Sequence, residues 1–169
     1  VFIAGSTWPE DEVHLQKLID KNKNFKYIIV PHEISHEKSQ NWLNKYPNEL
    51  ALYYSIENNN DLKVKRILYV DQMGLLSKIY RYACVAYIGG GFGKGIHNIL
   101  EAAVYEIPVI FGPNFQRFAE AVLLKQQNIA FSINDSDELI QLVHRLVGDK
   151  EELQNRKEKT KNYFELQKN

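Results

Sequence analysis

The chain has 169 residues, 44% of them hydrophobic, which is enough to bury one substantial core, so we expect a single domain over residues 1–169. Basic and acidic side chains are equal in number, at 21 each, which excludes a strong long-range field that would attract nucleic acid or an anionic membrane surface. The single cysteine, Cys84, excludes a disulfide framework and favours a reducing compartment, and no apolar stretch approaches the roughly 20 residues of a membrane-spanning helix.

The first half of the chain alternates β-rich and helical segments. We expect strands at 1–4, 27–30, 50–56 and 66–70, helices at 9–22, 35–46 and 74–82, and a polar surface loop at 57–61. Pro9 suits the first turn of its helix, Pro31 ends the second strand, and Ser35 is a typical helix cap. The chain opens directly on an apolar strand without a polar lead-in, so we expect a fragment of a longer protein.

The second half continues this alternation. We expect strands at 83–88, 108–111 and 130–133, a glycine-rich turn at 89–95, helices at 96–105, 115–127 and 136–147 (capped by Ser136), and a charged helix over 150–169. Strands separated by such helices need crossover connections, which predicts an α/β fold with a Rossmann-like parallel sheet and helices on both faces. Such sheets bind ligands beyond the carboxyl ends of their strands, where Gly5, Gly89 and Gly112 all fall.

The segment Gly5-Ser6-Thr7 lies between a buried strand and a helix. Its backbone N–H groups, its two hydroxyls and the positive end of the helix dipole together suit an anion. Serine and threonine are also ordinary helix caps, so a plain capping turn is the alternative interpretation.

Five glycines occur among residues 89–95, where they allow the backbone to approach a ligand closely or to adopt positive φ. The run matches neither the P-loop spacing nor the dinucleotide-binding spacing. His97 and Glu101 stand four residues apart, so we expect them on one face of the following helix, near its positive end. Glu101 could then accept hydrogen bonds from ribose hydroxyls, and His97 could orient a phosphate. A surface His–Glu pair beside a capping Asn98 is the alternative.

Weaker candidates follow other strands. Asn114, in the rigid turn after residue 111, either caps the next helix or contacts a ligand. His32 and the Met73-Gly74 pair each lie at the carboxyl end of a strand. No spacing typical of metal ligands occurs, so we expect no metal site.

Taken in chain order, these motifs resemble those of the 3-deoxy-D-manno-octulosonic acid (Kdo) transferases. The motifs are Ala4-Gly5-Ser6-Thr7, Pro31-His32-Glu33, Met73-Gly74, Gly89-Gly90, His97-Asn98-x-x-Glu101-Ala102-Ala103, Gly112-Pro113-Asn114-Phe115 and Phe118-x-Glu120-Ala121. The resemblance covers nearly all of residues 1–132. It implies the C-terminal half of a GT-B glycosyltransferase, which binds CMP-Kdo as the donor substrate and carries no cofactor.

The resemblance also implies roles for individual residues. Gly5, Ser6 and Thr7 would line the phosphate region, His97, Asn98 and Glu101 would contact phosphate and ribose, His32, Met73 and Gly74 would flank the cytosine, and Gly90, Gly91 and Asn114 complete the donor-binding set. The family's catalytic base is a glutamate of the N-terminal domain, which has no counterpart in this chain, so we expect the chain alone to be inactive. The full-length protein would transfer Kdo to a lipid A precursor, held by that other domain, at the cytoplasmic face of the bacterial inner membrane.

Two other functions remain compatible with the sequence. The first is a UDP-sugar transferase or a nucleotide-sugar epimerase of the same GT-B shape, which a preference for another nucleotide base would indicate. The second is a non-catalytic nucleotide-binding module. A preceding domain with an apolar anchor would favour the transferase over this module.

Overall fold

The computed structural model describes residues 1–56 and 59–166 and contains a seven-stranded sheet. The strands are β1 (Phe2–Thr7), β2 (Tyr27–Pro31), β3 (Leu50–Leu52), β4 (Ile67–Tyr69), β5 (Val85–Ile88), β6 (Val109–Phe111) and β7 (Ala130–Ser132). The α-helices are α1 (Pro9–Lys21), α2 (His36–Lys45), α3 (Asn59–Val64), α4 (Leu76–Ile79), α5 (Leu100–Ala103), α6 (Ala119–Gln126), α7 (Ser136–Gly148) and α8 (Lys150–Leu166). Short 3-10 turns lie at Tyr53–Ser55 and Tyr80–Tyr82.

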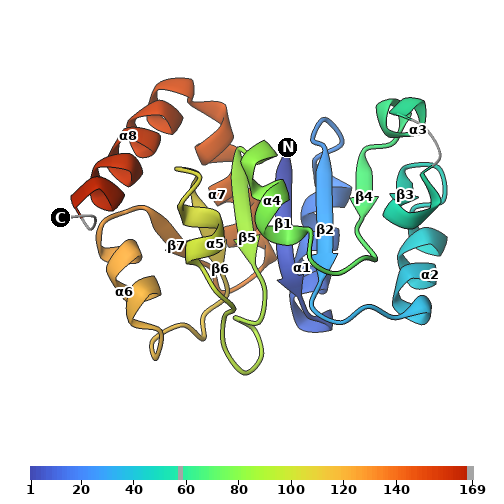
Figure 1. Ribbon diagram of the computed structural model, residues 1–169, viewed down its shortest axis with the longest axis horizontal. Helices are drawn as coiled ribbons and strands as arrows, with labels where there is room; N and C mark the ends of the chain where they lie inside the picture. The colour runs from blue at the N-terminus through green and yellow to red at the C-terminus, as the bar shows by residue number, and fades with distance from the viewer. Residues whose placement is uncertain (57–58, 167–169) are drawn as a thin grey trace.

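Among the described residues, every pairing between strands is parallel, in the order β3-β4-β2-β1-β5-β6-β7. This arrangement confirms the predicted α/β class with a parallel sheet. The order reverses between β1 and β5, because the chain builds from β1 toward one edge and then crosses back to build toward the other (Figure 1). In sheets of this kind, ligands bind beyond the carboxyl ends of the strands at the reversal.

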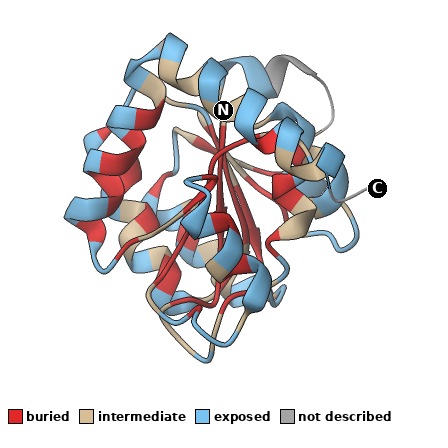
Figure 2. Ribbon diagram, turned by 90° about the vertical axis from the view of Figure 1, so that its left-hand side faces the viewer, coloured by how far each residue is buried: buried red, intermediate tan, exposed pale blue. Residues whose placement is uncertain are grey.

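Helices cover both faces of the sheet, as predicted. Along β1, Phe2 and Ala4 point into one core and Ile3 into the other, since successive side chains of a strand face opposite ways. The first core is closed by α1, α2 and α7, and the second by α4, α5, α6 and α8. Figure 2 shows the buried strands in the middle of the molecule and the exposed outer faces of the helices.

Helix caps set two of the boundaries. The Ser35 side chain accepts a hydrogen bond from the backbone N–H of Lys38 at 3.1 Å, so α2 begins at the predicted cap. At α7 the predicted cap, Ser136, is wrong. Asp135 Oδ1 instead accepts from the backbone N–H of Glu138 at 2.9 Å, because aspartate caps as well as serine and lies one residue earlier.

Two predictions in the first half of the chain are wrong. The strand predicted over 50–56 ends at Leu52, and the chain turns at Tyr53–Ser55, where the backbone N–H of Tyr54 donates to Asp71 Oδ1. The polar run 57–61, predicted as a loop, lies outside the described residues at 57–58 and is helical from residue 59 onward.

Two helices in the second half begin later than predicted. The helix predicted over 96–105 begins at Leu100, because the backbone N–H of His97 donates to Gly89 O at 3.1 Å and closes the glycine loop instead of entering a helix. The helix predicted over 115–127 begins at Ala119, since a turn at 115–118 precedes it. Apolar periodicity continues through both loops and therefore does not mark where the helices begin.

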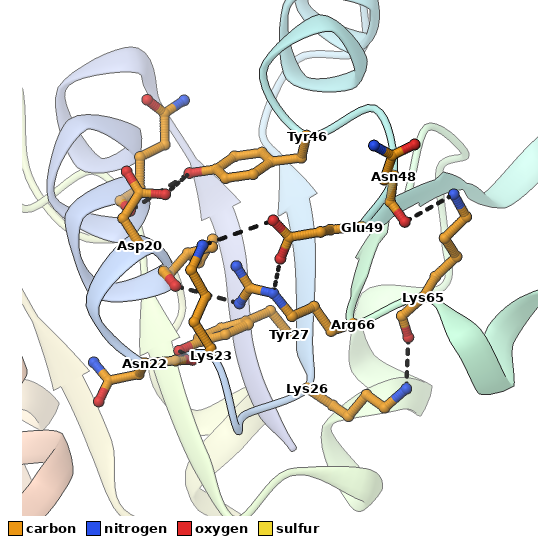
Figure 3. Close-up of polar contacts among 12 residues, drawn as sticks. Asp20, Asn22, Lys23, Lys26, Tyr27, Tyr46, Asn48, Glu49, Lys65 and Arg66 are labelled. Carbon is orange, nitrogen blue, oxygen red and sulfur yellow. Dashed lines mark hydrogen bonds and ion pairs between the residues drawn. The ribbon is translucent and has the colours of Figure 1, made fainter.

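A polar network holds the β3–β4 edge of the sheet to α1, at the amino ends of the strands (Figure 3). The Arg66 guanidinium donates through Nε to the Glu49 carboxylate and through Nη1 to Ile19 O at 3.2 Å. The hydrogen bond from Arg66 lowers the pKa of Glu49. Lys26 Nζ donates to the carbonyls of Lys63 and Lys65. This network lies at the end of the sheet opposite to the candidate site.

Candidate functional site

The loops that follow β1, β2, β5 and β6 meet at the carboxyl ends of the strands, along the lower edge of Figure 1. Backbone hydrogen bonds join them. Gly89 N–H donates to Gly5 O at 2.9 Å, and Asn114 N–H donates to Gly91 O at 2.9 Å. Residues far apart in the sequence therefore form one surface at the reversal of strand order.

Ser6 is the most unusual backbone position in this region. Its φ is 53°, which few residues other than glycine adopt, and the pairing of β1 with β2 shifts register around it. Bulges and left-handed residues concentrate at functional sites, where surrounding structure offsets their strain. Thr7, in contrast, is only 2% exposed, and its hydroxyl donates to Glu12 Oε1 at 3.0 Å. The Thr7 side chain therefore belongs to the scaffold.

Several glycines of the predicted set lie where neighbouring atoms leave no room for a side chain. A Cβ atom at Gly91 would lie 2.5 Å from Gly112 N, and one at Gly5 would lie 2.0 Å from the Tyr80 hydroxyl. Gly90 has φ of 92°, a conformation that disfavours side chains. Gly5 and Gly91 are thus explained by close packing, without a ligand.

Three aromatic side chains stack above this surface. The His32 and His97 rings lie 4.2 Å apart between centroids, and the Trp8 ring lies 4.6 Å from His32. Trp8 Nε1–H donates to His97 Nε2 at 2.9 Å, so that nitrogen is unprotonated. Burial, together with the neighbouring His32, lowers the pKa of His97 and favours its neutral form.

The expected helix face carrying His97 and Glu101 is not formed, because His97 lies outside α5. Asn98 lies two residues before α5, and its Oδ1 accepts from the backbone N–H of Leu100 at 3.0 Å. Asn98 Nδ2 donates to Glu101 Oε1 at 3.3 Å. Burial of the Tyr80 phenol, and to a smaller extent the charge of Glu101, raises the pKa of Tyr80.

The remaining predicted residues take different places. Asn114 does not cap α6, which begins five residues later; its Nδ2 donates to Gly93 O at 2.9 Å and holds the glycine loop. Met73 is 72% exposed, and Gly74 has φ of 83° with open space around it. Both lie on the loop after β4, and neither lines the hollows described next.

Two hollows adjoin His97. The first, of about 230 Å³, is lined by Trp8, Glu10, Gly90, Gly93, Lys94, Gly95 and His97. The second, of about 240 Å³, is lined by Ile96, His97, Asn98, Ile99, Leu100, Phe118 and Glu120. Of the predicted residues, the structure thus brings Gly90, His97 and Asn98 to these hollows, with His32 stacked on His97.

A larger hollow, of about 420 Å³, lies at the β7 edge of the sheet, beside Lys125, Phe131 and Arg145. It lies away from the reversal between β1 and β5, and none of the predicted site residues lines it. Size alone therefore does not identify the site. The hollows beside His97 occupy the position where sheets of this kind bind ligands.

Sequence reasoning missed two residues of this site. Trp8 was not singled out, although it directly follows the predicted anion-binding segment. In the sequence Asp11 is only one of three acidic residues in the first turn of a helix, but in the structure it is completely buried and binds the glycine loop. Asp11 Oδ2 accepts from the backbone N–H of Trp8, but the indole cannot accept a hydrogen bond in return, so the sequence carries no capping-box signal here.

Within the described ranges, no group of three or more His, Cys, Asp or Glu side chains could hold a metal ion. None of the helices there is long and apolar enough to cross a membrane.

The chain is similar to known glycosyltransferases. It is 31% identical over 169 residues to the bifunctional glycosyltransferase/methyltransferase of Fusobacterium nucleatum, an alignment that covers 98% of this chain and 26% of that protein. It is 32% identical over 157 residues to the 3-deoxy-D-manno-octulosonic acid transferase of Rickettsia typhi, covering 88% of this chain and 33% of that protein. The chain thus spans a quarter to a third of the length of these curated relatives. No protein-family profile matches it.

Solved structures share the fold. The C-terminal CMP-Kdo binding domain of WaaA from Acinetobacter baumannii superposes with a TM-score of 0.77 at 18% identity, covering 95% of this chain and 86% of that one. The apo structure of OtsA gives a TM-score of 0.58 at 15% identity, covering 94% of this chain and 38% of that one. The predicted GT-B-type architecture is confirmed by these likenesses.

Proposed function

The chain is a relative of the Kdo transferases, and we propose that it is the donor-binding part of such an enzyme, with CMP-Kdo as its ligand. One observation carries the proposal. A chain with 32% identity to a 3-deoxy-D-manno-octulosonic acid transferase gathers the strained Ser6, the glycine loop and His97 at the reversal of strand order. That reversal is where parallel sheets of this class bind nucleotides.

The geometry supports a revised assignment of roles. In this proposal the phosphate lies beside Ser6 and the glycine loop, whose Gly90 amide is held by Asp11, with His97 next to it as a neutral hydrogen-bonding group. Backbone amides of glycine-rich turns are good donors to phosphate. Gly91 and Asn114 act indirectly, by holding the loops together, Gly5 by admitting the Tyr80 hydroxyl beside β1, and Thr7 by its hydrogen bond to Glu12 of α1.

In this proposal the ribose and the cytosine contact different parts of the site. Glu101 accepts hydrogen bonds from the ribose hydroxyls, and Asn98 orients its carboxylate. His32, Met73 and Gly74, on the loops after β2 and β4, flank the cytosine. Met73 is exposed and can therefore move onto a bound base.

The activity of the whole protein is part of the same proposal. It would transfer Kdo to a lipid A precursor in lipopolysaccharide synthesis, at the cytoplasmic face of the bacterial inner membrane. The acceptor and the catalytic base would come from another domain. The isolated chain is accordingly expected to bind the donor without transferring the sugar.

A thermal-shift comparison of cytidine, uridine and guanosine monophosphates tests the proposed ligand. CMP at about 100 times its dissociation constant should stabilise the folded chain by about 2.7 kcal/mol, because a ligand that binds only the native state shifts unfolding. For a domain of this size, the melting temperature should rise by about 5–10 °C. UMP and GMP should raise it less. A larger shift with UMP or GMP would contradict the assignment of CMP-Kdo as donor.

A further inference from the structure

Asp11 lies in the first turn of α1 and is 0% exposed, and its carboxylate accepts three hydrogen bonds. Oδ2 accepts from the backbone N–H of Trp8 at 2.9 Å and from that of Gly90 at 2.8 Å. Oδ1 accepts from the Tyr87 hydroxyl at 2.7 Å. One side chain therefore joins the start of α1 to the end of β5 and to the glycine loop, across the reversal of strand order.

The two amides that share Oδ2 belong to walls of the same hollow. Trp8 and Gly90 both line the hollow of about 230 Å³ beside His97, whereas Asp11 itself does not line it. The indole of Trp8 in turn donates to His97. The Asp11 carboxylate thus fixes the separation of the Trp8 wall from the glycine-loop wall without reaching the hollow.

The hydrogen bond from Tyr87 to Asp11 can be removed by mutation without removing the two backbone hydrogen bonds to Asp11. Burial and the adjacent Asp11 carboxylate raise the pKa of Tyr87 well above its ordinary value, so the phenol keeps its proton and donates it. Removing the phenolic oxygen takes one hydrogen bond from Oδ1. It leaves both amide contacts at Oδ2 in place.

We propose that Asp11 is a positioning residue for the nucleotide sugar, and that its negative charge holds Trp8 and the glycine loop at the binding separation before the donor arrives. This inference rests on the proposed function, because it concerns the same site. A site preorganised in this way binds more tightly, because little ordering remains to be completed on association. Hydrogen bonds to a charged acceptor are also stronger than those to a neutral one.

The test compares Asp11→Asn with Tyr87→Phe by calorimetric titration with CMP. Both variants weaken a buried hydrogen-bonded cluster and should melt at lower temperature than the parent chain. Asp11→Asn keeps an oxygen that can accept from the two N–H groups but removes the charge that strengthens both bonds, so its dissociation constant for CMP should rise by about fivefold or more. The dissociation constant of Tyr87→Phe for CMP should stay within about twofold of that of the parent chain. Equal losses in the two variants, or unchanged affinity in Asp11→Asn, would overturn the inference.

Amide hydrogen exchange at Trp8 and Gly90 tests the same inference without nucleotide. Exchange at both amides should accelerate about tenfold relative to the rest of the sheet in Asp11→Asn and stay unchanged in Tyr87→Phe. If the parent chain binds no CMP, the proposed function fails, while exchange still decides whether Asp11 positions the loop. Should Asp11→Asn not fold, Asp11→Glu replaces it. Its longer side chain displaces the carboxylate, so an unchanged rate at Gly90 would contradict the inference.

Discussion

Replacing Gly89 by alanine should destabilise the chain by about 3 kcal/mol or more, which corresponds to a fall in melting temperature of about 10 °C for a domain of this size. A Cβ atom at Gly89 would lie 2.1 Å from Ser6 O and 2.7 Å from Thr7 Cα. Both neighbours are backbone atoms at the strained end of β1, so no side chain can rotate away to make room. The loop after β5 would have to separate from β1. Thermal or urea unfolding measures the loss.

Gly93→Ala is the matched control for stability, since it adds the same methyl group to the same loop. The nearest atom to a Cβ at Gly93 is Gly90 O, at 3.7 Å, which is an ordinary contact. Its stability should therefore change by no more than about 0.5 kcal/mol. If Gly89→Ala proved as stable as Gly93→Ala, the close packing of the two loops would be wrong. Gly93 lines the hollow beside His97, so this variant serves as a control for folding only.

Glu101→Ala should weaken CMP binding by at least ~1.5 kcal/mol, the scale of a hydrogen bond to a charged group, which is more than tenfold in dissociation constant. The proposed role gives Glu101 two ribose hydroxyls as partners. In the free chain its carboxylate receives a hydrogen bond only from Asn98 among the described contacts, so it has further capacity to accept. Calorimetric titration with CMP measures the effect.

Asp137→Asn is the control for Glu101, because it removes a carboxylate that is exposed on α7 and paired with Lys21. Its affinity for CMP should equal that of the parent chain. A second comparison uses CMP and 2′,3′-dideoxycytidine monophosphate. The parent chain should bind the dideoxy nucleotide much more weakly than CMP, whereas Glu101→Ala should bind the two nucleotides with similar affinity. Equal losses in the two proteins would exclude the ribose role.

The fold was predictable because its signals are local and repeated. Short β-rich runs alternate with helical ones, and parallel pairing follows from the crossover length that each helix provides. Caps such as Ser35 fixed some boundaries to the residue. The late start of α5 was not predictable from periodicity. Ile96 and Ile99 belong to an irregular segment, yet their side chains are buried as completely as they would be in a helix.

The site was predictable in position but only partly in detail. Glycines near the end of β1 and directly after β5 and β6 mark the carboxyl ends of neighbouring strands, so the location follows from the order of segments. Their sequence spacing does not distinguish a glycine that admits a ligand from one, such as Gly91, that admits another loop. The role of Asp11 was not predictable from the sequence for a related reason. A carboxylate in the first turn of a helix has an ordinary explanation, and its partners at Tyr87 and Gly90 are 76 and 79 residues away in the sequence.

Mapping backbone amide shifts by NMR during a CMP titration shows directly whether the nucleotide binds at the reversal between β1 and β5. The largest shifts should occur at Ser6, Gly90, His97 and Asn98, with smaller ones at the β7 edge. Shifts centred instead on the larger hollow beside Phe131 and Arg145, or spread evenly over the chain, would contradict it.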